Sequence, residues 1–309
     1  MIKVFFCCSW DSDIENFLKT KYLPLTPNES GKFKNIEAVT DIKNAEWVVI
    51  IDDIHNNYLN EILNFDKSKI ICIPREPGNI TPKYKKFDFK YDYTYDNFFH
   101  CWSSIMAIEK NYDELLNFKL PLKTKLCSSI TSGFNGGSGL YIKRIDMIKK
   151  ISKEKKFIDK IDLYGYNWSK DELGEMYKGV FGGFNTGTCK KIENLIPNTT
   201  KWDGLDKYSY SIAIENCIKK NYFSEKFTDC ILSWTIPIYI GCPNIGDFFP
   251  KDCYYVLDID SPNIIEEIDN ILKKPITKRN IVALGVARRL ILDKYNVWNM
   301  VNEIILNDK

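Results

Sequence analysis

The side chains best suited to chemistry in this sequence lie in one stretch, residues 208–250. The candidates are Glu215, Asn216, Tyr222, Glu225 and Lys226. Glu215 and Asn216 follow an apolar run typical of a buried strand, so they would lie at the carboxyl edge of a sheet, where ligands bind in α/β proteins. Ser224 is a suitable N-cap for the helix expected next, with Lys226 in its first turn. A lysine there is favourable when an anion binds at the helix start; a solvated lysine is the alternative.

A glycine-rich loop at residues 132–139 is a second candidate. It lies between an expected strand and an expected helix, and Gly136 and Gly137 would let the backbone approach a ligand closely. The free N–H groups of a helix start favour phosphate. The loop matches neither G-x-x-x-x-G-K-[ST] nor G-x-G-x-x-G, so a flexible loop without a ligand is the alternative. Arg144, about one turn into the helix, would add a charged fork for a diphosphate.

Two series of alternating strands and helices must position these residues. In the first half, strands are expected at 2–8, 46–52 and 69–76, and helices at 12–23, 56–65 and 97–118. In the second half, strands are expected at 125–131, 160–167, 208–216, 236–241 and 254–260, and helices at 140–156 and 224–234. This alternation is typical of parallel sheets with helices on both faces.

The two series meet near residues 119–123, where Pro121 interrupts the pattern. We therefore expect an α/β fold with two Rossmann-like αβα domains, at residues 1–120 and 121–290. A C-terminal helix, 291–309, would pack back on the first domain. Ligands of such sheets bind beyond the carboxyl ends of the strands, so the site is expected in an interdomain cleft.

Composition and charge exclude several classes of protein. The 43 Lys and Arg residues nearly balance the 41 Asp and Glu residues, and a formal charge of +2 does not suit a nucleic-acid-binding protein. The two histidines lie far apart and no C-x-x-C pair occurs, so no metal site is expected. No apolar run approaches the ~18 residues of a membrane span, and the N-terminus does not read as a signal peptide. These features predict a soluble cytoplasmic protein.

The stretch 208–250 resembles the signature of the α1,3-fucosyltransferases, glycosyltransferase family 10. The matching residues, in order, are Glu215-Asn216-Cys217, Tyr222 to Lys226, Ile236-Pro237-Ile238, Gly241 and Phe248-Phe249-Pro250. Upstream, Arg144 resembles the arginine of the family's diphosphate-binding helix. In the first half, residues 71–80 resemble the short stretch that carries the family's general base, which points to Glu76.

The sequence also departs from the family pattern. Ile214 replaces the usual Phe and Cys217 the usual Ser, and both changes are tolerable in packing. Residues 170–205, which should help to shape the donor pocket, have no convincing match.

The resemblance implies a GT-B enzyme that transfers fucose from GDP-fucose to a glycan hydroxyl with inversion. Such an enzyme requires no metal or other cofactor besides its nucleotide-sugar donor. Glu76, in the N-terminal, acceptor-side domain, would be the general base. Arg144 and Lys226, with the N–H groups of Gly136 and Gly137, would stabilise the negative charge on the departing diphosphate.

Three further residues take their roles from the same resemblance. Glu225 would hold the ribose, while Asn216 and Tyr222 would position the phosphates and the sugar. The expected partners are a nucleotide sugar and a glycan acceptor, with no nucleic acid and no membrane span.

Two other functions stay open on the sequence. The first is a glycosyltransferase of the same fold and mechanism that uses another donor, such as a UDP-hexosamine or a UDP-deoxysugar. The second is a non-catalytic module that binds a glycan or a nucleotide. The presence of Glu76, Arg144, Glu225 and Lys226 argues against the second function.

Overall fold

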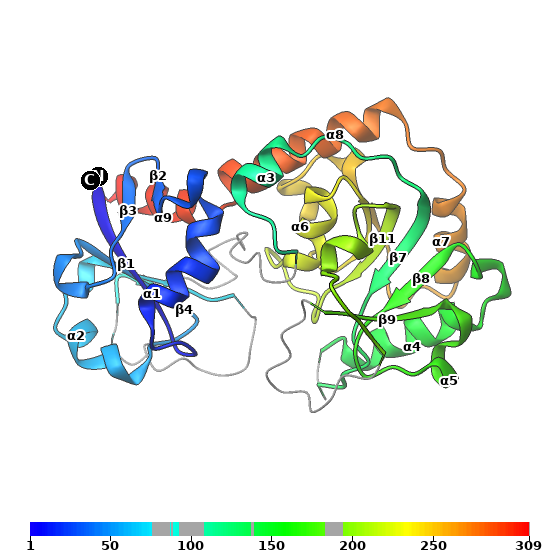
Figure 1. Cartoon of the computed structure of the whole chain (residues 1–309), viewed down its shortest axis with the longest axis horizontal. Helices are drawn as coiled ribbons and strands as arrows, with labels where there is room; N and C mark the ends of the chain where they lie inside the picture. Colours follow the sequence, from blue (N-terminus) through cyan, green and yellow to red (C-terminus); the bar gives the residue numbers. More distant parts are fainter. Residues whose placement is uncertain (76–86, 88, 93–107, 137–138, 183–193, 309) are drawn as a thin grey trace.

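Two mostly parallel sheets, one in each half of the chain, organise this protein (Figure 1). The computed structural model describes residues 1–75, 87, 89–92, 108–136, 139–182 and 194–308.

The first sheet has the strand order β2-β3-β1-β4-β5-β6. Its strands are β1 (Ile2–Cys8), β2 (Lys32–Phe33), β3 (Ile36–Ala38), β4 (Trp47–Ile51), β5 (Ile70–Ile73) and β6 (Tyr91–Asp92), and its short helices are α1 (Ile14–Phe17) and α2 (Leu59–Leu63). All pairings are parallel except β2 with β3. Every residue of β4 and β5 is buried, as expected for parallel strands whose two faces are both covered.

The second sheet has the strand order β10-β9-β8-β7-β11-β12-β13 and is parallel throughout. Its strands are β7 (Lys125–Ile130), β8 (Ile161–Tyr164), β9 (Tyr177–Phe181), β10 (Leu195–Ile196), β11 (Tyr208–Ile214), β12 (Ile236–Ile240) and β13 (Tyr255–Val256). From β7 the chain builds outward through β8, β9 and β10, and then returns to pair β11 with the other side of β7. The strand order therefore reverses between β7 and β11, and ligands of open α/β sheets bind at such a point.

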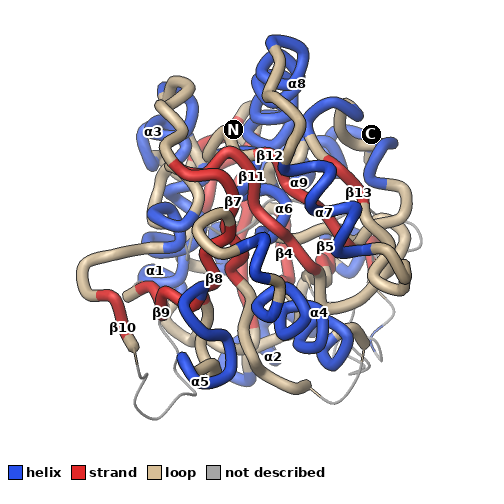
Figure 2. The backbone as a smooth tube through the Cα atoms, turned by 90° about the vertical axis from the view of Figure 1, so that its right-hand side faces the viewer, coloured by secondary structure: helices blue, strands red, loops and turns tan. Residues whose placement is uncertain are grey.

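Helices cover both faces of the second sheet. The helices that accompany this sheet are α4 (Tyr141–Lys153), α5 (Lys170–Leu173), α6 (Glu225–Leu232), α7 (Ile264–Leu272) and α8 (Lys278–Arg289). By contrast, α3 (Tyr112–Asn117) packs against the first half, where the Tyr112 ring meets that of Phe33. Figures 1 and 2 show α4 and α7 on the side of the sheet turned away from the first half, and α6 on the opposite side. α4 buries Met147, Ile148 and Ile151 at the three- and four-residue spacing of one helix face.

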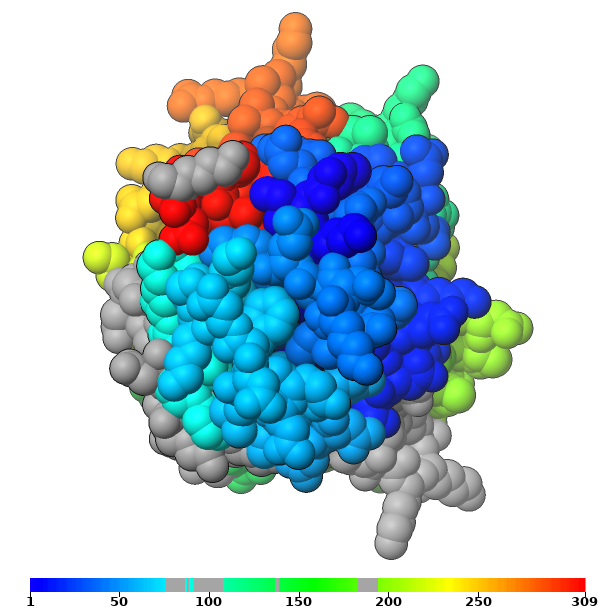
Figure 3. All heavy atoms as spheres, turned by 90° about the vertical axis from the view of Figure 1, so that its left-hand side faces the viewer, coloured from blue at the N-terminus to red at the C-terminus, as the bar shows by residue number. Residues whose placement is uncertain are grey.

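The last helix, α9 (Val297–Asn307), packs against the first half of the chain. Trp298 is fully buried, its indole N–H donates to the Tyr22 carbonyl at 2.9 Å, and its ring lies 4.9 Å from that of Phe6. The Asn296 amide donates to the Leu25 carbonyl at 2.8 Å. Figure 3 shows the last residues, in red, seated among the blue and cyan N-terminal ones. The chain thus crosses between the two halves twice.

The predicted α/β class and its two Rossmann-like sheets, as in the GT-B type, are confirmed. The long helix expected at 97–118 is wrong over its described part, which is helical only in α3. Asn111 is the N-cap of α3 and so marks the start of the helix. Its side chain accepts a hydrogen bond from the Glu114 N–H, and the Glu114 carboxylate accepts one from the Asn111 N–H. Residues 97–107 lie outside the described residues.

Candidate donor-binding site

A cavity of about 300 Å³ opens at the carboxyl ends of β7, β8 and β11. Its wall is made by the ends of these strands, the loop 131–134, the first turns of α4 and α6, and the residues that follow β8. The cavity therefore lies where the strand order of the second sheet reverses. The described residues that line it all lie between residues 130 and 226.

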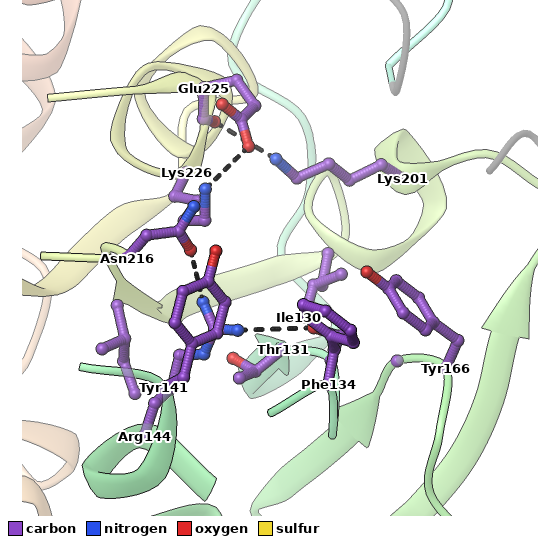
Figure 4. Close-up of a pocket in the computed structure, with 13 residues that line it drawn as sticks. Ile130, Thr131, Phe134, Tyr141, Arg144, Tyr166, Lys201, Asn216, Glu225 and Lys226 are labelled. Carbon is purple, nitrogen blue, oxygen red and sulfur yellow. Dashed lines mark hydrogen bonds and ion pairs between the residues drawn. The ribbon is translucent and has the colours of Figure 1, made fainter. Parts of the chain in front are cut away.

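Arg144 lies in the first turns of α4 and enters the cavity from below in Figure 4. The residue is only 3% exposed. One guanidinium nitrogen, Nη1, donates to Asn216 Oδ1 at 2.7 Å, and Nη2 lies 3.4 Å from Ser132 Oγ. The Tyr141 ring lies 4.9 Å from the guanidinium carbon. These contacts hold the guanidinium between the loop after β7 and the end of β11.

The charge of Arg144 has no carboxylate partner at ion-pair distance in the described part of the chain, and its Nε is buried without a hydrogen bond. Burial lowers the pKa of Arg144, but a guanidinium stays charged in proteins. A buried cation is costly unless an anion or hydrogen-bond acceptors compensate it. The cavity is therefore suited to an anionic ligand.

Glu215 fixes the start of α6. It is fully buried, and its carboxylate accepts from the Ser224 N–H at 2.8 Å, the Ser224 hydroxyl at 2.6 Å and the Tyr239 hydroxyl at 3.2 Å. Burial raises the pKa of Glu215, whereas the charge of Lys226 lowers it. Glycine is required at 241, because a Cβ there would lie 2.4 Å from Glu215 Cγ and from the Tyr239 hydroxyl.

Glu225 and Lys226 begin α6 at the edge of the cavity. Their side chains pair at 3.1 Å and are 41% and 21% exposed. Lys226 Nζ also lies 3.4 Å from Ser224 Oγ and 3.9 Å from the Glu215 carboxylate. Burial raises the pKa of Glu225, but the charges of Lys226 and Lys201 lower it more, so the pKa lies below its usual range. Glu225 is thus an ionised hydrogen-bond acceptor beside a cation.

The sequence did not predict Lys201, although this residue also lines the cavity. Its ammonium pairs with Asp229 at 2.8 Å and donates to the Glu225 carbonyl at 3.2 Å. Burial raises the pKa of Asp229 to about 6, although the charge of Lys201 lowers it. The local signal in the sequence was the T-x-x-D capping box Thr200–Asp203, which predicts a helical turn. It does not predict that Lys201 pairs with Asp229, 28 residues later.

Aromatic side chains were missed as well. Phe134, Tyr141 and Tyr166 line the cavity, and the rings of Phe134 and Tyr141 meet edge to face at 5.8 Å. Phe134 is 46% exposed. Such rings offer flat apolar surfaces against which a base or a sugar can pack.

Four of the predicted residues meet in this cavity: Arg144, Asn216, Glu225 and Lys226 (Figure 4). The side chain of Tyr222 is fully buried and does not line it. Gly136 also lies outside the lining, and it packs against Tyr141, since a Cβ at 136 would meet that ring at 2.7 Å. Gly137 and Glu76 lie outside the described residues.

The residue before Glu76 is held tightly at the carboxyl edge of the first sheet. The Arg75 backbone N–H donates to Asp52 Oδ1 at 2.6 Å, and its guanidinium bonds Asp52 Oδ2 at 2.9 Å. The guanidinium also lies 4.2 Å from the centre of the Trp10 ring. The position at which the chain enters the segment beginning with Glu76 is therefore fixed.

A family model described as glycosyltransferase family 10 (fucosyltransferase), C-terminal part, matches residues 120–275, just over half of the chain. The chain belongs to glycosyltransferase family 10. The matched range of this family 10 chain runs from the residues before β7 to just beyond α7 and contains all the described residues that line the cavity.

Curated relatives match the family 10 chain over shorter stretches. It is 39% identical over 70 residues to alpha-(1,3)-fucosyltransferase B of Drosophila melanogaster, and 40% identical over 68 residues to alpha-(1,3)-fucosyltransferase FucT of Helicobacter pylori. Each match covers 22% of this chain, and the matches cover 16% and 14% of those two proteins. A crystal structure of an alpha1,3-fucosyltransferase aligns over 99% of this chain and 89% of that chain, with 14% identity and a TM-score of 0.49.

Two features are absent from the described residues, a membrane-spanning helix and a cluster of metal ligands. Within them, no helix combines the length and the apolar character needed to cross a bilayer. The same residues contain no cluster of three or more His, Cys, Asp or Glu side chains arranged to hold a metal ion.

Proposed function

We propose that this family 10 chain is an inverting fucosyltransferase that moves fucose from GDP-fucose to a hydroxyl of a glycan. The observation that carries the proposal is the buried guanidinium of Arg144, which lines a cavity at the strand-order reversal together with Lys226. Two cations at one cavity suit a diphosphate. Family membership and the names of the relatives support fucose as the sugar. GDP is proposed as the nucleotide because residues 208–250 resemble the signature of enzymes that use GDP-fucose.

The proposed reaction is a single displacement at the anomeric carbon. The oxygen of the acceptor hydroxyl forms a bond to that carbon as the bond from the carbon to the diphosphate oxygen breaks. Glu76 takes the hydroxyl proton, and GDP leaves with the electron pair of the broken bond. Attack from the face opposite the leaving group inverts the configuration of the carbon.

The donor residues have separate roles in this proposal. Arg144 and Lys226 stabilise the charge that grows on the leaving diphosphate. Asn216 holds the Arg144 guanidinium through the 2.7 Å hydrogen bond, and so positions it for the phosphates. Glu225, held ionised by the lysines beside it, accepts hydrogen bonds from the ribose hydroxyls. Tyr222 supports this wall of the site from the core, where it is fully buried.

The two halves of the chain divide the work. We assign residues 1–120 to the acceptor side and residues 121–290 to the donor, with 291–309 completing the first half. The contacts of Trp298 and Asn296 with Tyr22 and Leu25 support this division.

The mechanism is tested by Glu76→Gln. We expect sugar transfer from GDP-fucose to fall to background, because the amide cannot accept the proton, while the affinity for GDP stays unchanged. The measurements are a transfer assay over a panel of glycan acceptors and titration calorimetry with GDP. Glu61→Gln makes the same change on an exposed face of α2 and should alter neither quantity.

The two measurements separate the possible failures. Transfer that persists in Glu76→Gln would place the base elsewhere. A loss of GDP affinity in the same variant would instead give Glu76 a role in donor binding or in stability.

A further inference from the structure

Lys201 is buried at the cavity wall, where burial of a lysine has a cost. Its side chain is 7% exposed and that of its partner Asp229 is 2% exposed. Removing both charges from water is expensive, and a buried pair is weak evidence of a purely stabilising role. A role in ligand binding would explain why a buried ion pair lies at this position.

The geometry around Lys201 fixes its ammonium group. The residue begins a short 3-10 turn, Lys201–Gly204, whose start is capped by Thr200 and Asp203 and whose Trp202 ring lies 4.9 Å from that of Phe118. From this turn the side chain crosses to α6, where Nζ meets Asp229 at 2.8 Å and the Glu225 carbonyl at 3.2 Å. Figure 4 shows Lys201 approaching α6 from the side opposite Asn216.

The ammonium has a hydrogen-bond donor to spare. An ammonium group has three N–H bonds, and its two hydrogen bonds in the described part of the chain are those to Asp229 and Glu225. Because Lys201 lines the cavity, the third N–H is available to a ligand there. Asp229 balances the charge of Lys201, so the contribution would be a directed hydrogen bond rather than a net positive field.

We propose that Lys201 is a further donor-binding residue: Asp229 holds its ammonium at the cavity wall, where it fixes the first turn of α6 and donates a hydrogen bond to an oxygen of the bound nucleoside diphosphate. The inference rests on the proposed function, since it requires that donor in this cavity. It assigns a role to the segment 194–204, for which the fucosyltransferase signature offers no match.

The test compares variants of this pair by titration calorimetry with GDP on the full chain. Lys201→Met with Asp229→Asn removes both charges together and so avoids an unpaired buried carboxylate. We expect it to bind GDP about tenfold more weakly or worse, the usual loss for a hydrogen bond to a charged group. Asp229→Asn alone keeps a neutral acceptor for Lys201 and should weaken GDP binding less than the double variant does.

This difference between the variants is the readout that a purely structural pair would not give. If the Lys201–Asp229 pair only supported the fold, the single and the double variant would each change the free energy of unfolding. The affinity for GDP would then fall in proportion to the loss of stability in both variants. Lys125→Met is the matched control, because it breaks the 2.7 Å pair with Asp162 at the end of β7 away from the cavity. It should leave GDP affinity unchanged.

The outcomes distinguish this inference from the function on which it rests. A wild type that binds neither GDP nor UDP would overturn the proposed function, and the Lys201 role with it. A wild type that binds GDP, together with a double variant of equal affinity, would overturn the role of Lys201 alone. Weaker binding by Asp229→Asn to the extent of the double variant would also overturn it.

Discussion

At the scale of single residues, the decisive feature is the buried guanidinium of Arg144, whose charge an anionic ligand would compensate. Arg144 is 3% exposed, and two of its nitrogens donate hydrogen bonds to neutral oxygens, those of Asn216 and Ser132. Neutral acceptors orient a guanidinium without cancelling its charge. Arg144 therefore keeps its positive charge at the cavity, in surroundings where screening by water is weak.

We predict that Arg144→Ala lowers kcat/KM for the donor sugar by at least ~10²-fold, as expected for the loss of one group that stabilises developing charge. The measurement is steady-state transfer at varied donor concentration. Lys143→Ala is the matched control, since Lys143 is the adjacent residue of α4, is exposed and pairs with Asp260. It should retain near-normal turnover. Near-normal turnover in Arg144→Ala would remove the diphosphate contact from the mechanism.

At the scale of elements, α6 presents Glu225 and Lys226 because Glu215 holds its first residues. The Glu215 carboxylate bonds both the N–H and the hydroxyl of Ser224, the N-cap of α6. The fit is close, with the Gly241 backbone packed directly against Glu215 and Tyr239. The position of the helix start is therefore set by a strand end, a cap and a glycine from three separate places in the sequence.

Gly241→Ala tests this fit. We expect the added methyl group to lower the free energy of unfolding by about 1–3 kcal/mol, because the neighbours at 2.4 Å must move. Gly285→Ala is the control, since its Cβ would meet the Trp234 ring at 3.5 Å within α8. That change should be neutral or stabilising by about 0.5–1 kcal/mol, the gain expected for Ala over Gly in a helix. Denaturant unfolding measures both, and equal stability of the two variants would contradict the close fit.

The elements also show what the sequence could and could not predict. The strands β1, β4, β5 and β12 were predictable because each is a short, nearly continuous apolar run. The two-residue strands β2, β6 and β10 were not predicted, because so short a segment carries no periodic pattern. Glu225 and Lys226 were predictable because they are neighbours in one motif. Lys201 was not, since its site role depends on a partner on another element. For the same reason the sequence could not foresee that Gly136, expected at the ligand, packs against Tyr141 and lies outside the cavity lining.

At the scale of the whole molecule, the cavity lies in the second half of the chain, whereas the candidate base, Glu76, belongs to the sequence of the first half. Two connections join the halves, the segment before β7 and the return of α9 to the first half. Arg288, at the end of α8, donates to the carbonyls of Leu115 and Phe118 and so ties the two connections together. The proposed donor binding can therefore be tested separately from the proposed role of Glu76.

The central claim is that the cavity binds the nucleoside diphosphate of a fucose donor, and titration of the full chain with GDP and with UDP tests it most directly. The buried Arg144 predicts saturable binding of a nucleoside diphosphate, one per chain, and the family 10 match predicts that GDP binds more tightly than UDP. Arg144→Ala should weaken this binding. Tighter binding of UDP than of GDP would contradict the proposed donor, and absence of binding by either nucleotide would contradict the assignment of the cavity itself.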